Sequence, residues 1–207
     1  MNNKYSMWYI IGGVVGLVAL FIFSLRIQTS QSLLSGPALG TIGNLQKGLP
    51  PWPAEFDHLH QRLNQIGLPA LAQEGTALHI HQHLDIDVEG VSVPIPAGIG
   101  IDPHEQFISP IHVHDTTGIV HVESPVIQNY TLGQFFDIWG LTFSEQCIGG
   151  KCNSENETLR VYVNGILYQG DPRAIVLSAH QEIFVFYGTA QQLPKNIPSQ
   201  FAFPEGY

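Results

Sequence analysis

Histidines at every second position, in two segments of the chain, constrain the fold more than any other feature of the sequence. Side chains two residues apart lie on the same face of a β-strand, so this spacing predicts strands that gather imidazoles on shared faces. Imidazole is the commonest metal ligand among protein side chains. The spacing therefore predicts metal binding by six residues, not all of which need bind the same ion: His79, His81, His83, His112, His114 and His121.

The first of these segments, residues 78–95, is predicted to form a β-hairpin. Apolar and polar residues alternate along it, and Gln82 is the only interruption of the apolar face. A turn at 89–90 pairs Val88 with Val91, so that apolar partners share one face and the histidines occupy the other.

The register of the second hairpin, residues 111–123, decides which side chains share a face. A four-residue turn over 115–118 pairs His112 with His121, whereas a three-residue turn with a glycine bulge pairs His112 with Val122. A slip of one residue exchanges the two faces of a strand, and the apolar pattern favours the first register. Four side chains are then expected on one surface: His112, His114, His121 and Glu123.

Three or four neutral histidines suit zinc or copper, and two such strands side by side would bring their nitrogens to about 2.0–2.1 Å from one ion. Asp115 and Glu123 can orient a ligand ring through its second nitrogen or bind directly. The only methionines are Met1 and Met7, which excludes a methionine-rich copper(I) site. The alternative interpretation is a solvated polar face without metal.

A run of nineteen residues without charge, Met7–Leu25, precedes the domain. Such a run is long enough to cross a hydrocarbon core of about 30 Å. A cleaved signal peptide is the alternative, but the run is longer than a signal core and no A-x-A-like cleavage site follows it. The expected organisation is a membrane anchor at 1–27, a tether at 28–53, a His-rich domain at 54–190 and a proline-containing tail at 191–207.

Charge and cysteine content limit the expected binding partners and the cellular location. A formal net charge of −9 with only eight Lys and Arg makes nucleic-acid binding improbable. Cys147 and Cys152 are expected to form a local disulfide, with free thiols as the alternative. The acidic character of the domain behind the predicted anchor favours an exported location, periplasmic or at the cell surface.

The remaining segments predict an α+β domain. Helical periodicity occurs at 55–66 and again at 132–139, where a capping box at Thr131 precedes it. A hairpin is expected at 159–168, and strands at 174–177 and 182–187. The order predicts a helix packed on an antiparallel or mixed sheet. Residues 118–188 resemble a β-grasp arrangement, and a β-sandwich with one helix is the alternative.

Four segments carry a resemblance to a group of uncharacterised bacterial proteins with a single membrane anchor and an extracytoplasmic domain. They are the HxHxH motif and its continuation at 79–86, IPAGIG at 95–100, HVHDTTGIVHVES at 112–124 and TLGQFFDIWG at 131–140. The resemblance covers most of residues 52–207. It implies a bacterial, exported domain and no particular activity.

The sequence thus predicts a membrane-anchored, extracytoplasmic protein that binds copper or zinc. One alternative is a metalloenzyme that uses the same ligands beside a small pocket at the 98–100 loop. The other is a metal-free accessory module of a membrane complex, whose histidines are solvated. No H-E-x-x-H or G-x-S-x-G motif is present, so no catalytic residue is predicted.

Overall fold

The computed structural model of the chain describes residues 43–207. The predicted anchor at 1–27 and the first part of the predicted tether lie outside the described residues. Among residues 43–207, no helix has the length and apolar character needed to cross a membrane.

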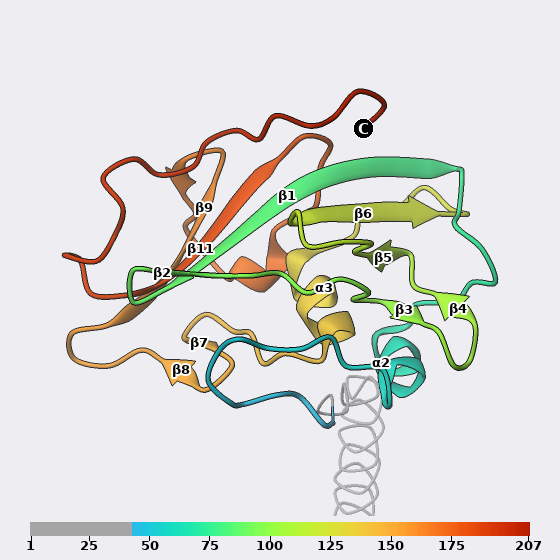
Figure 1. Cartoon of the computed structure of the whole chain (residues 1–207), viewed down its shortest axis with the longest axis horizontal. Coiled ribbons are helices and arrows are strands. Elements are labelled where there is room, and N and C mark those ends of the chain that lie inside the picture. The colour runs from blue at the N-terminus through green and yellow to red at the C-terminus, as the bar shows by residue number, and fades with distance from the viewer. Residues whose placement is uncertain (1–42) are drawn as a thin grey trace, which may run out of the picture. The chain divides into compact units, whose positions relative to one another are not determined.

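A mixed sheet of seven strands forms the centre of an α+β fold (Figure 1). Its order is β10–β9–β11–β1–β6–β5, with β2 also paired to β1; the β1–β11 pair is parallel and the others are antiparallel. The strands are β1 (Leu78–Val88), β2 (Val91–Val93), β5 (Ile111–His112), β6 (Ile119–Ser124), β9 (Thr158–Val163), β10 (Ile166–Leu167) and β11 (Glu182–Gly188). Two small sheets pair β3 (Ile101–Asp102) with β4 (Phe107–Ile108) and β7 (Cys147–Ile148) with β8 (Lys151–Cys152).

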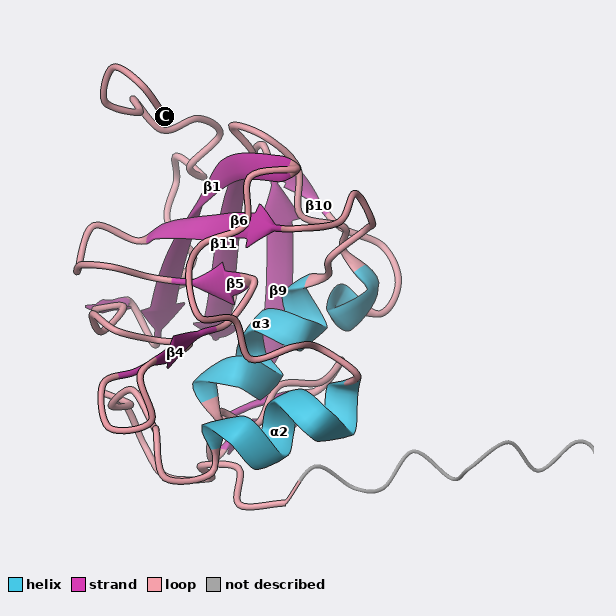
Figure 2. Cartoon of the chain, turned by 90° about the vertical axis from the view of Figure 1, so that its right-hand side faces the viewer, coloured by secondary structure: helices cyan, strands magenta, loops and turns pink. Residues whose placement is uncertain are grey.

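Two helices, α2 (Leu59–Ile66) and α3 (Leu132–Trp139), lie on the same side of this sheet (Figure 2). The predicted capping box at the start of α3 is confirmed, and Gly140 ends the helix in the left-handed conformation. Helix α2 begins later than predicted, because the Glu55 carboxylate accepts the backbone N–H of His58 and pairs with buried Arg62, which holds residues 55–58 in a turn.

Alternation along β1 and β6 divides the sheet into an apolar face and a polar face. The apolar face packs against α3 in the main core. Burial of this surface supplies most of the stabilisation of the fold. Gln82, the one polar residue predicted on this face, is fully buried, and its amide donates to the carbonyl of Val120 (2.7 Å). The apolar side chains involved include Leu84, Ile86, Val120, Val122, Phe135, Phe136 and Trp139.

Two of the three predicted hairpins have the expected two-residue turns, at 89–90 and at 164–165. Val88 pairs with Val91, and the turn residues Glu89 and Gly90 have positive φ. The turn at 164–165 has the same character. These residues fix which face of each strand meets the core.

The predicted strand at 174–177 is wrong. The chain there forms a short 3₁₀ helix, η1 (Pro172–Ala174), followed by a single bridge to the start of α3. The amide of Leu132 donates to the carbonyl of Ile175, and the amide of Leu177 donates to the carbonyl of Tyr130. The backbone groups of this segment are therefore satisfied by the residues around the helix N-terminus instead of by the sheet.

The described part of the predicted tether packs on the domain. Trp52 is only 2% exposed, and its ring meets that of Trp139 edge to face. The amide of Gln46 donates to the carbonyl of Gly140 (2.7 Å). The folded domain therefore includes residues before 54.

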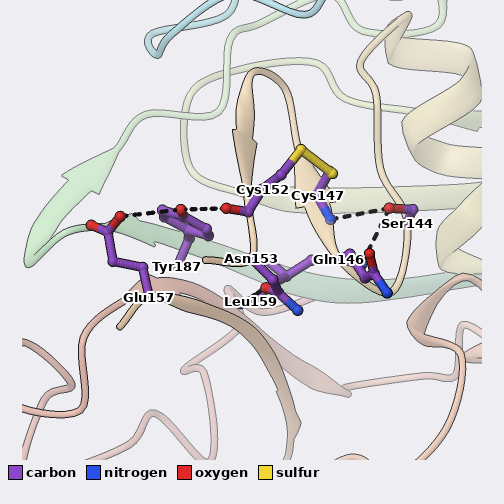
Figure 3. Close-up of a disulfide and its surroundings, with 8 residues drawn as sticks. All are labelled: Ser144, Gln146, Cys147, Cys152, Asn153, Glu157, Leu159 and Tyr187. Carbon is purple, nitrogen blue, oxygen red and sulfur yellow. Dashed lines mark hydrogen bonds between the residues drawn. A yellow bond between two sulfur atoms is a disulfide. The ribbon is translucent and has the colours of Figure 1, made fainter. Parts of the chain in front are cut away.

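The predicted disulfide between Cys147 and Cys152 is present (Figure 3). It joins the short strands β7 and β8 across their turn. The hydroxyl of Tyr187 in β11 donates to the carbonyl of Cys152 (2.7 Å), which ties this hairpin to the main sheet.

Candidate metal centre

Strand β6 lies between β1 and β5, and all three strands carry histidines on the polar face of the sheet. On one side His121 is opposite His81 of β1, and on the other side it is opposite His112 of β5. Glu123 is opposite His79. The four-residue-turn register predicted from the apolar pattern is confirmed for the His112–His121 pair.

The glycine loop at 98–100 fixes the path of the chain after β5. Val113 directly follows β5, and its backbone exchanges hydrogen bonds with Gly98 and Ile99. A Cβ atom at Gly100 would lie 2.5 Å from the carbonyl oxygen of Ile111, so only glycine fits this close approach. The loop therefore supports the backbone of the His112 segment from outside the sheet.

Six side chains converge on this face: His79, His81, His112, His114, His121 and Glu123. One atom each from His112, His114, His121 and Glu123 lies within 4.8 Å of the others, and the same is true of His79, His81 and Glu123. The Nε2 atoms of His112 and His114 are 3.2 Å apart, and those of His79 and His81 are 3.1 Å apart. Nitrogens bound tetrahedrally at 2.0–2.1 Å from an ion lie roughly 3.3 Å apart. The observed spacings match such a ligand shell.

Hydrogen bonds fix which ring nitrogens are free to bind. Nδ1–H of His112 donates to the carbonyl of Ser109 (2.9 Å), and Nδ1–H of His121 donates to Oε1 of Glu123 (2.9 Å). In each neutral ring the lone pair is then on Nε2. Partners of this kind orient metal-ligating histidines and increase their basicity toward the ion.

Burial keeps three of these histidines neutral at pH 7. It lowers the pKa of His81 to about 4, of His112 to about 3 and of His121 to about 4, and the neighbouring imidazoles act in the same direction. The neutral imidazole is the form that binds a metal, so these rings need not lose a proton when an ion enters.

Acidification is therefore expected to destabilise the metal-free protein. Below the ordinary histidine pKa of 6.5, the unfolded chain binds protons that folded His81, His112 and His121 do not bind until about pH 4 or below. This loss of folding stability is absent above pH 6.5 and grows as the pH falls. Thermal unfolding of chelator-treated protein should show a Tm that falls through this interval, less steeply in His112→Ala. An unchanged Tm would contradict the burial argument.

His83 belongs to a different group of potential ligands from the other five histidines. Its Nδ1 is 2.9 Å from Oε2 of Glu182, its Nε2 is 3.0 Å from the carbonyl of Thr117, and its ring stacks on Phe201 at 3.8 Å. Burial acts to lower the pKa of His83, but the Glu182 carboxylate raises it above its usual value. His83, Asp85 and Glu182 are close enough together to hold an ion, yet both nitrogens of His83 already have acceptors.

Asp115, predicted to orient a ligand ring or to bind directly, makes a contact within its own loop. It is exposed, and its carboxylate accepts the backbone N–H of Thr117 (2.8 Å), so it shapes the loop between β5 and β6. His60 and His104 are exposed and contribute to no potential metal-binding group of the described chain.

Two residues near the histidine cluster, Glu74 and Tyr207, were not predicted from the sequence. Oε1 of Glu74 lies 3.3 Å from Nε2 of His114. The ring of Tyr207 lies 4.7 Å from that of His81, and Nε2–H of His180 donates to the Tyr207 carbonyl oxygen (2.9 Å). The tail, dark red in Figure 1, thus runs along the polar face of the sheet, where Leu193 and Ile197 also pack on aromatic residues of β9 and β11. Neither contact follows from local periodicity.

Comparisons with protein-family models, curated proteins and solved structures found no match to this chain.

Proposed function

We propose that the chain is a membrane-anchored, extracytoplasmic protein that binds copper or zinc at the histidine cluster on the outer face of its sheet. The observation that carries the proposal is the convergence of His112, His114, His121 and Glu123, with one atom from each within 4.8 Å of the others. Three of the four side chains are buried. A solvated polar surface would not need such burial.

The donor set favours copper or zinc over magnesium or calcium. Hard cations prefer shells made of oxygen ligands, whereas neutral imidazoles suit the later transition metals. Hydrogen bonds to Ser109 and Glu123 already orient the rings of His112 and His121. These contacts support binding with little reorganisation.

Two observations support the proposed location. The uncharged run at 7–25 has the length of a membrane span, and the Cys147–Cys152 disulfide is favoured by an oxidising compartment. The proposed partner of the N-terminal segment is the membrane, with a membrane protein as a further proposed partner. We also propose that the chain is related to the group of membrane-anchored bacterial proteins and that residues 118–188 form a β-grasp arrangement.

Elemental analysis of the full-length chain, purified in detergent without chelators, tests the metal proposal. We expect copper or zinc at one equivalent or more, and loss of metal in His112→Ala/His121→Ala. The matched control is His60→Ala/His104→Ala, which removes two exposed histidines and should leave the metal content unchanged. A folded chain without metal would overturn the proposal and favour the accessory-module alternative.

A further inference from the structure

Glu123 stands between two sets of histidines that come from different strands. His79 and His81 lie on β1, whereas His112 and His114 belong to β5 and the loop after it, and β6 carries Glu123 between those strands. Neighbouring strands are about 4.8 Å apart, so the two sets approach the carboxylate from opposite sides. Glu123 is the one residue common to both groups of potential ligands.

The number of donors exceeds what one ion takes. Zinc in proteins is almost always bound by four ligands. This face presents five imidazoles and a carboxylate within two overlapping groups. One group supplies three histidines and the other supplies two, and each is completed by Glu123.

The burial of Glu123 also favours a positive charge beside its carboxylate. The residue is only 4% exposed, and its Oε1 lies 3.3 Å from Nε2 of His79 and 4.0 Å from Nε2 of His112. A buried carboxylate is costly unless it is paired with a cation or coordinates a metal. The same oxygen, Oε1, therefore approaches histidines of both sets, and a carboxylate can bridge two ions through one oxygen or through both.

We infer that this face holds two transition-metal ions, one on each side of Glu123, with the Glu123 carboxylate bridging them. The inference rests on the proposed function and gives it a stoichiometry. His112, His114 and His121 bind the first ion, and His79 and His81 bind the second. The second ion has fewer protein ligands, and His79 is about half exposed, so this ion is the more weakly bound and the more accessible one.

Metal titration of the full-length, chelator-treated chain tests the inference, with Zn²⁺ and Cu²⁺ each used alone. Bound metal is measured by elemental analysis after equilibrium dialysis. We expect two equivalents in the wild-type chain and in the His60→Ala/His104→Ala control. His79→Ala/His81→Ala should bind one. Circular dichroism of every variant checks that it is folded.

The number of bound ions distinguishes failure of the proposed metal-binding function from failure of the two-ion site. No bound metal in a folded chain overturns the proposed function itself, whereas one equivalent in the wild type leaves that function standing and overturns the two-ion site. Glu123→Gln, which cannot bridge as a carboxylate, should bind at most one ion; two tightly bound ions in this variant would overturn the bridging role. With Cu²⁺, electron paramagnetic resonance should show coupling between two nearby ions in the wild type and none in His79→Ala/His81→Ala.

Discussion

Replacing His112 with alanine is expected to lower the affinity for metal by at least about 100-fold. His112 is completely buried, its Nδ1–H is held by Ser109, and its Nε2 lies 3.2 Å from that of His114. Loss of a residue that merely orients a ligand costs 10–100-fold in affinity, so loss of a ligand itself should cost no less. Competition with a chromophoric chelator measures the change.

A buried histidine can also matter for folding, and a second variant separates the two effects. The side chain of His114 is 42% exposed, so His114→Ala should remove a ligand with little effect on stability. His104→Ala is the control, because His104 is an exposed histidine outside the cluster. If His114→Ala and His112→Ala both bind metal as tightly as His104→Ala, neither residue is a ligand.

Local sequence patterns were sufficient to predict which strand positions of the candidate site lie opposite each other. The alternation of apolar residues in 111–123 selected the register that places His112 opposite His121, because a slip of one residue would have buried the imidazoles in the core. Turn residues with positive φ, such as Asn164 and Gly165, fixed hairpins in the same way. Both kinds of information are contained within a few neighbouring residues.

Long-range pairings were beyond such patterns. His83 has the same spacing as His79 and His81, and only the parallel pairing of β1 with β11 brings Glu182 opposite it. The position of Tyr207 over His81 depends on the path of the whole tail. Burial of Trp52 was not predicted, because it lies in a proline- and glycine-rich stretch whose composition resembles a linker. Its ring is nevertheless buried against the core.

Replacing Glu182 with leucine is expected to lower the free energy of unfolding by about 3–5 kcal/mol. Glu182 is 1% exposed and its carboxylate lies 2.9 Å from Nδ1 of His83, so the change leaves the buried ring without its partner. Removing one member of a buried pair typically has an effect of this size, whereas removing both is much less costly. The double variant His83→Leu/Glu182→Leu should therefore be more stable than Glu182→Leu alone.

The pH dependence of this loss tests the pairing. Because the pKa of His83 is raised above 6.5, the stability that it contributes is fully present below pH 6.5 and is lost as the pH rises through the folded value. Denaturant unfolding should show a larger difference between wild type and Glu182→Leu at about pH 6 than at about pH 9. Equal differences at both values would contradict a charged pair. Unchanged metal content in Glu182→Leu would place His83 outside the metal centre, whereas loss of a bound ion would return it to the ligand set.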